Sequence, residues 1–77
     1  MSQENSKSIL GVYEHYKGQK YHVIELVRHS ETLELLVLYE ALYDNPQGRF
    51  WVRPKNMFFE KIVINGKKMD RFRKLEN

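Results

Sequence analysis

The chain contains no cysteine, which excludes a disulfide framework and any metal site built from thiolates. It has no apolar run long enough to cross a membrane. Its first residues, MSQENSKS, are polar and lack the apolar segment that a secretion signal needs. From these absences we predict a cytoplasmic protein.

The motifs of common catalytic and metal sites are missing as well. The sequence has no nucleophile elbow, no phosphate-binding loop and no pair of carboxylates with an evident acid-base partner. Its three histidines, His15, His22 and His29, lie seven residues apart, which is not the spacing of a metal-binding motif. We expect no enzyme, no cofactor and no metal site, although a catalytic group assembled from distant residues would have no such motif.

Positive charge is unevenly distributed along the chain. Residues 1–60 hold seven Lys or Arg against eight Asp or Glu, whereas residues 61–77 hold six against two. A domain that binds nucleic acid usually spreads its positive charge over one face of the fold. Nucleic-acid binding is therefore the alternative function, and it would use the basic residues near the C-terminal end: Lys67, Lys68, Arg71, Arg73 and Lys74.

The size and apolar content of the chain predict one small domain. With 77 residues, of which 42% are hydrophobic and 13% aromatic, it can fold without metal or disulfide support. Residues 1–8 have almost no apolar side chains, so we predict a disordered tail there. The domain is predicted to span residues 9–72, and residues 73–77 are predicted to fray.

The first half of the domain shows the alternation that is typical of strands. Leu10–Tyr16 and Tyr21–Val27 are predicted strands, joined by a tight reversal. The run Glu31–Tyr43 is rich in helix formers, and Ser30 stands where an N-cap would stand. Its apolar residues would nevertheless surround a helix on all sides, which so small a protein cannot bury. Period two gives one continuous face, made up of Leu35, Val37, Tyr39, Ala41 and Tyr43. We therefore favour a central strand.

Turn residues divide the second half of the chain. Asp44–Gly48 (DNPQG) predicts a turn, and Arg49–Arg53 then alternates as a strand. Pro54–Phe58 predicts one turn of 3₁₀ helix. Asn65-Gly66 predicts a type I′ hairpin turn within residues 62–69. Five or six short antiparallel strands in this order predict a small SH3-like barrel.

Three stretches of the chain resemble the bacterial family known as domain of unknown function 1653. They are GVYEHYKGQKY at 11–21, RHSETLELLVLYEALY at 28–43 and WVRPKNMF at 51–58. The resemblance covers nearly all of the part that we expect to be ordered. It implies an SH3-like fold and supports the strand at 34–43, and it implies no activity, substrate or cofactor.

The polar segment Arg28–Thr32 (RHSET) has two interpretations. As a hairpin loop, its hydroxyls bond nearby backbone groups, and Glu31 or Glu34 pairs with Arg28. As a ligand site, the guanidinium is a bidentate donor to an acidic group, and the imidazole and hydroxyls are further donors. We favour the loop and keep the site as a hypothesis that comprises Arg28, His29, Ser30, Glu31 and Thr32.

Trp51 stands between Arg49 and Arg53 on a predicted strand. Such an aromatic ring can stack on a ligand while the guanidiniums bind its charge. It can also cap one end of a small core while the Arg stems cover it, and we favour this second role. The tyrosines similarly fit either an aromatic-lined peptide groove or an ordinary strand surface.

Our functional hypothesis is a small binding or adaptor module. We expect it to recognise a peptide or acidic ligand of an unknown partner through an Arg/aromatic face, because aromatic and Arg residues occur together and catalytic spacings do not. The residues of this face, besides the RHSET segment, are Tyr39, Trp51 and Arg53.

Overall fold

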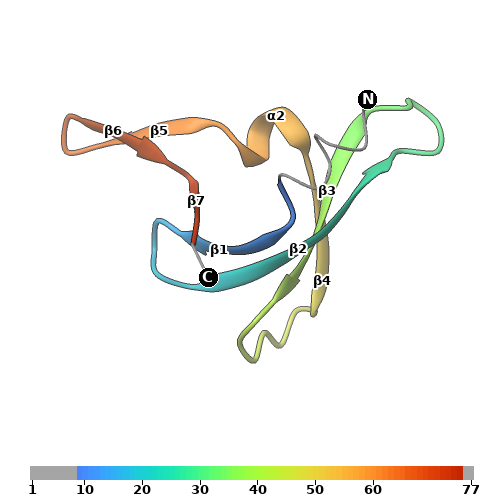
Figure 1. The fold of residues 1–77 in the computed structure, drawn as a ribbon, viewed down its shortest axis with the longest axis horizontal. Coiled ribbons are helices and arrows are strands. Elements are labelled where there is room, and N and C mark those ends of the chain that lie inside the picture. Colours follow the sequence, from blue (N-terminus) through green and yellow to red (C-terminus); the bar gives the residue numbers. More distant parts are fainter. Residues whose placement is uncertain (1–8, 76–77) are drawn as a thin grey trace.

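The computed structural model of the chain describes residues 9–75, so the predicted disordered tail at residues 1–8 lies outside the described part. The elements follow in chain order (Figure 1) as β1 Gly11–His15, β2 Lys20–Arg28, β3 Leu35–Ala41, β4 Phe50–Pro54, α2 Lys55–Phe58, β5 Lys61–Ile64, β6 Lys67–Asp70 and β7 Phe72–Lys74. The described part is therefore mainly β with a short helical segment after Pro54, as predicted.

Five strands form one antiparallel sheet in the order β4-β3-β2-β1-β7, and β5 and β6 form a separate two-stranded sheet. Figure 1 shows that the large sheet is strongly curved and that α2 and the β5–β6 hairpin lie on its concave side. The last strand returns beside the first, so both ends of the domain belong to the same sheet.

The run that had both a helical and a strand interpretation is strand β3. Val37, Tyr39 and Ala41 are buried, and their neighbours Leu38 and Glu40 are half-buried. The strand pairs with β2 on one side and with β4 on the other, which confirms the predicted central position. We call the face of the sheet that carries Val37 and Tyr39 the inner face, and the opposite face the outer face.

The core lies on the inner face and is mostly aromatic. Phe58, from α2, is fully buried and stacks on Phe72 of β7 with the ring centroids 4.1 Å apart. Tyr13 and Tyr39 contact Phe58 at centroid distances of 5.4 and 5.3 Å. Large aromatic rings supply most of the buried apolar surface in a domain of this size. The short helix therefore places one aromatic side chain at the centre of the core.

Helix α2 lies where one turn was predicted, but it is α-helical rather than 3₁₀. The Phe59 N–H donates to the Lys55 carbonyl at 3.2 Å, which is the i to i−4 bond of an α-helix. The prediction of a 3₁₀ helix was based on the shortness of the segment. It did not include the packing of the segment against the rest of the protein. In residues 9–75 no helix is long and apolar enough to span a membrane.

The chain stays ordered beyond the predicted end of the domain. β7 pairs with β1 as far as Lys74, which lies opposite Tyr13, and the Leu75 N–H donates to the Val12 carbonyl at 2.9 Å. Phe72 is buried in the core and anchors this strand. The expectation of fraying therefore does not hold for residues 73–75, and residues 76–77 lie outside the described part.

The β5–β6 hairpin has the turn that the sequence predicts. Asn65 and Gly66 have φ values of 53° and 77°, and a type I′ turn requires positive φ at both positions. Every strand residue of the hairpin except Ile62 is exposed. A two-stranded hairpin gains little from its own apolar contacts, so its position depends on the segments that connect it to α2 and β7.

Candidate functional site

Strand β4 brings Trp51 and Arg53 together on the inner face. The register places Trp51 opposite Tyr39 and Arg53 opposite Val37. Residues that lie directly opposite each other in an antiparallel sheet point to the same face. The predicted alternation of this strand is therefore correct. Trp51 and Arg53 lie on the inner face, and Phe50 and Val52 lie on the outer face.

Arg53 has no ion pair among the residues that the structure describes. Its guanidinium carbon lies 5.7 Å from the centre of the Phe72 ring, so this side chain reaches across the curved sheet to the other edge strand. The Arg53 Nε is buried and has no hydrogen-bond partner in the described part of the chain. A buried donor without a partner costs roughly 1–3 kcal/mol, and an acceptor that reached it would recover this cost.

Arg71 and His15 are related to Arg53 electrostatically, because His15 is affected by the charges of both arginines. Arg71 is mostly buried, its Nε has no hydrogen-bond partner, and its Nη2 lies 3.6 Å from a carboxylate oxygen of Glu60. The pKa of His15 is lowered by burial and then by the charges of Arg53, Arg71 and Lys17. These contacts make a region of positive potential, which we call the Arg53 surface: Trp51, Arg53, Arg71 and His15.

Trp51 is half-buried and packs against the core cluster. Its indole N–H donates to the Gly48 carbonyl at 3.0 Å, which fixes the ring against the turn between β3 and β4. This geometry agrees with the role of a core cap that we favoured from the sequence. Because the ring is only half-buried, part of it is also accessible to a ligand.

Tyr39 is a core residue. It is 5% exposed, and its ring packs against Tyr21, Phe58 and Phe72 at centroid distances of 5.3, 5.3 and 5.8 Å. The hydroxyls of Tyr21 and Tyr43 bond at 2.6 Å, and burial and this bond raise the pKa of Tyr21. A ligand on the surface therefore cannot reach Tyr39, and these tyrosines pack with one another instead of lining an open groove.

His29 organises the loop between β2 and β3. Its N–H donates to the Glu34 carbonyl and its carbonyl accepts from the Leu33 N–H, both at 2.9 Å. Its Nδ1 accepts from the backbone N–H groups of Glu31 and Thr32 at 3.1 and 3.3 Å. From the sequence, this histidine was a candidate only as a donor to a ligand. Its role as an acceptor for two loop amides depends on the loop conformation, which the sequence does not give.

Two further side chains of the RHSET segment, those of Thr32 and Arg28, also bond within their own loop, whereas no such bond of the Ser30 or Glu31 side chain is found in residues 9–75. The Thr32 hydroxyl accepts from the Glu34 N–H at 3.2 Å, as the loop interpretation predicts. Arg28 donates to the Leu33 carbonyl at 2.8 Å instead of pairing with Glu31 or Glu34. The register places Arg28 on the same side of the sheet as Arg53, but its guanidinium turns back to the loop. The structure therefore does not join this loop to the Arg53 surface.

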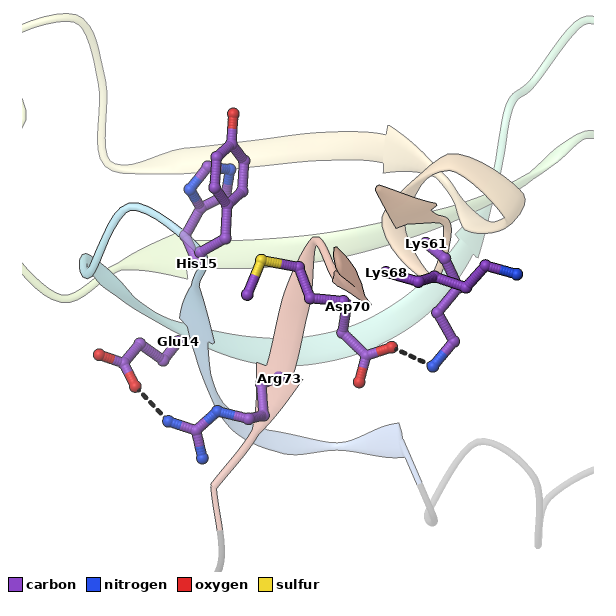
Figure 2. Close-up of a pocket in the computed structure, with 8 residues that line it drawn as sticks. Glu14, His15, Lys61, Lys68, Asp70 and Arg73 are labelled. Atoms are coloured by element: carbon purple, nitrogen blue, oxygen red, sulfur yellow. Dashed lines mark hydrogen bonds and ion pairs between the residues drawn. The ribbon is translucent and has the colours of Figure 1, made fainter. Parts of the chain in front are cut away.

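A cleft of about 530 Å³ opens between β1, β7 and the β5–β6 hairpin (Figure 2). Its lining residues are Glu14, His15, Tyr16, Lys61, Lys68, Met69, Asp70 and Arg73. The two carboxylates are paired, because Arg73 binds Glu14 and Lys61 binds Asp70, each at 2.6 Å. No local pattern in the sequence predicts this cleft. The turn at Asn65-Gly66 places Lys61 opposite Asp70, but it does not place the hairpin beside β1.

The arrangement is suited to the binding of anions. A guanidinium beside an aromatic ring binds a carboxylate through charge and paired hydrogen bonds. His15 borders both the cleft and the Arg53 surface, so a ligand on one of them would change the electrostatic potential at the other. Within residues 9–75, no group of three or more His, Asp or Glu side chains is placed to hold a metal ion.

Comparison with known proteins gives a family and a similar fold. The family model described as "Protein of unknown function (DUF1653)" matches residues 11–74. A crystal structure of a protein belonging to DUF1653 from Bordetella bronchiseptica is 32% identical, with a TM-score of 0.82 over 86% of this chain and 85% of that chain. No curated protein matches the chain. Because the family model spans nearly all of the described residues, the chain belongs to the DUF1653 family.

Proposed function

We propose that the protein is a small binding module that recognises an acidic peptide segment through the Arg53 surface. The observation that carries this proposal is the guanidinium of Arg53, which lies on Phe72 without a carboxylate partner in residues 9–75. The buried Nε of Arg53 without a partner points in the same direction. A carboxylate bound to the outer nitrogens of the Arg53 guanidinium would accept hydrogen bonds from them and would neutralise the charge.

We further propose that the fold is an SH3-like barrel and that the module acts in the cytoplasm. The strand order β4-β3-β2-β1-β7, with one helical turn between β4 and the last strands, supports the barrel. The contact between Arg53 and Phe72 supports it as well, because a side chain of one edge strand reaches a ring of the other across the curved sheet. The absence of cysteine supports a reducing compartment.

The alternative function, nucleic-acid binding, has less support from the basic residues near the C-terminal end. Arg71 and Arg73 each lie within 3.6 Å of a carboxylate oxygen, so part of their charge is neutralised within the protein. Lys67 and Lys68 are exposed on β6 and would be the main phosphate contacts. Binding of a single-stranded oligonucleotide that weakens steeply with salt and is lost in the double variant Lys67→Gln/Lys68→Gln would favour this alternative.

The test of the proposed function uses Trp51 as a reporter, because it is the only tryptophan in the chain. The probe is an acetylated and amidated peptide, Val-Glu-Val-Glu-Val, and its control is the same peptide with Gln in place of Glu. We expect the acidic peptide to change the Trp51 fluorescence in a saturable manner, and we expect no saturation with the neutral peptide. Equal binding of both peptides, or of neither, would contradict the proposal.

Variants of Arg53 give the residue-level test. Arg53→Gln should weaken the acidic peptide roughly tenfold or more, since a hydrogen bond to a charged group contributes about 1.5–3 kcal/mol. Arg53→Lys keeps the charge but loses the planar pair of donors. Its affinity for the acidic peptide should therefore lie between those of the original chain and Arg53→Gln. Lys20→Gln is the charge-matched control, because Lys20 is exposed on β2 and points to the outer face. Thermal unfolding of each variant checks that it is folded.

A further inference from the structure

Strand β4 is at one end of the five-stranded sheet, so one side of its backbone has no strand partner in residues 9–75. The Ala41 N–H donates to the Arg49 carbonyl at 2.8 Å, which fixes the phase of the ladder between β3 and β4. In an antiparallel pair, successive residues direct their backbone groups alternately toward and away from the partner. The backbone N–H and carbonyl groups of Trp51 and Arg53 therefore point toward β3. Those of Phe50 and Val52 point to the open side.

Two side chains of this strand are of a protective kind, namely Pro54 at its end and the inward-pointing Arg53, but the positions of Phe50 and Val52 are not protected. Phe50 and Val52 are 56% and 53% exposed on the outer face, and β4 pairs with β3 without a bulge. Natural edge strands are usually protected by lysines, bulges or a covering segment. The other edge strand, β7, has only three residues, and its Arg73 is paired with Glu14. The β4 edge is therefore the better template for an additional strand.

The side chains on the two faces of β4 determine which residue types an added strand should carry. On the inner face, an acidic side chain beside Arg53 would meet the guanidinium that has no carboxylate partner in the described residues. On the outer face, apolar side chains would cover the exposed Phe50 and Val52. Successive residues of a strand point to opposite faces, so the two requirements alternate along the segment.

We infer that the acidic segment binds as an antiparallel strand on the open edge of β4, with apolar residues on the outer face and acidic residues on the inner face beside Arg53. This inference rests on the proposed function and adds the backbone geometry of the complex. It also specifies the ligand, which is an extended segment of a partner protein. This segment has alternating apolar and acidic residues and no proline at the paired positions.

The geometry makes a prediction about backbone methylation of the Val-Glu-Val-Glu-Val probe. Residues of the added strand that lie opposite Phe50 or Val52 share their outer face and direct their N–H groups toward β4. These are the valines, whereas the N–H groups of the glutamates point away from β4. N-methylation of the central valine should therefore reduce affinity at least tenfold, and N-methylation of one glutamate should leave it nearly unchanged.

Amide hydrogen exchange gives the second measurement on the same complex. Saturation with the unmethylated peptide should slow exchange at the Phe50 and Val52 amides, which face the open edge without it. Binding that requires Glu and Arg53 but tolerates methylated valine and leaves both amides unprotected would overturn the inference while the proposed function stands. Failure of the acidic peptide to bind at all would overturn both. Protection that grows with protein concentration in the absence of peptide would assign the edge to a second copy and would also overturn the inference.

Discussion

The β2–β3 loop and the edge strand β4 each place an arginine on the inner side of the sheet, and the two arginines are used differently. Arg28 donates to the Leu33 carbonyl at 2.8 Å, so its guanidinium closes the loop to which it belongs. Arg53 lies on the Phe72 ring, and its Nε has no hydrogen-bond partner. In the loop Arg28, His29 and Thr32 form local bonds, whereas on β4 the Arg53 guanidinium has no carboxylate partner in residues 9–75.

This difference shows why residue type alone does not identify a binding site. Both segments combine arginine with neighbouring polar or aromatic residues, and both were candidates on that basis. The local hydrogen bonds of the loop, centred on His29, indicate a structural role. The predictions that follow assign stability effects to the loop and core, and binding effects to β4.

The largest effect is expected for Tyr39→Ala. Because Tyr39 is a buried ring between the sheet and Phe58, its truncation should destabilise the protein by about 3–5 kcal/mol in urea unfolding. Tyr39→Phe is the matched control and should leave both stability and peptide affinity close to those of the original chain. A loss of peptide affinity in Tyr39→Phe at unchanged stability would make Tyr39 a contact residue and contradict its assignment to the core.

His29→Ala should have the next largest effect. The substitution removes the acceptor of the Glu31 and Thr32 amides, which should cost about 1–2 kcal/mol of unfolding free energy. His29→Asn keeps a side-chain acceptor at nearly the same place and should recover most of that loss. Peptide affinity should be the same in both variants. If His29→Ala weakened peptide binding without a change in stability, the loop would be the binding site.

A smaller change is expected at Leu33, which has a φ of 64° and lies in the left-handed region. A leucine is strained there, and asparagine tolerates this conformation better. Leu33→Asn should raise the unfolding free energy by roughly 0.5 kcal/mol, whereas Leu33→Ala keeps the strain and should not raise it. Chemical denaturation of the two variants side by side measures the difference, and a gain in Leu33→Ala as large as that in Leu33→Asn would contradict the strain.

The smallest effect concerns the pH dependence that His15 contributes. Its pKa in the folded protein is lowered by burial and then by Arg53, Arg71 and Lys17. Between its ordinary pKa of about 6.5 and the lower folded value, the unfolded chain binds a proton that the folded protein does not. Stability from this residue is therefore present above about pH 6.5 and is lost as the pH falls below it.

His15→Gln provides the measurement for this prediction. The unfolding free energy of the original chain should fall more steeply between pH 7.5 and about pH 5.5 than that of the variant. Saturation with the acidic peptide should reduce the difference, because a bound carboxylate compensates the cationic neighbours of His15. An identical pH dependence of the two proteins would contradict a lowered pKa of His15 in the folded protein.

Local patterns in the sequence predicted much of the fold. Asn65 and Gly66 encode their turn by themselves, since positive φ at both positions suits these two residues. Period-two alternation identified β3 because one face of the strand is buried along its length. The same alternation placed Trp51 and Arg53 on one side of β4.

The candidate site was less accessible to such reasoning because it depends on contacts between distant segments. Arg53 meets Phe72 only when the last strand returns beside the first, and no local pattern encodes that return. The contact of His15 with Phe72 depends on the same return, whereas the pairing of Arg71 with Glu60 continues the register of the β5–β6 hairpin. Fraying was predicted from residue 73 because the charged residues there give no local sign that Phe72 anchors a strand.

Chemical-shift mapping with the Val-Glu-Val-Glu-Val peptide on isotopically labelled protein distinguishes β4 from the loop in one experiment. We predict that the largest shifts occur at the Trp51 indole N–H, at the Arg53 Nε–H and at the backbone amides of β4, and that the amides of residues 29–34 stay unchanged. Shifts confined to residues 28–34, with Trp51 and Arg53 unaffected, would contradict the assignment of ligand binding to β4.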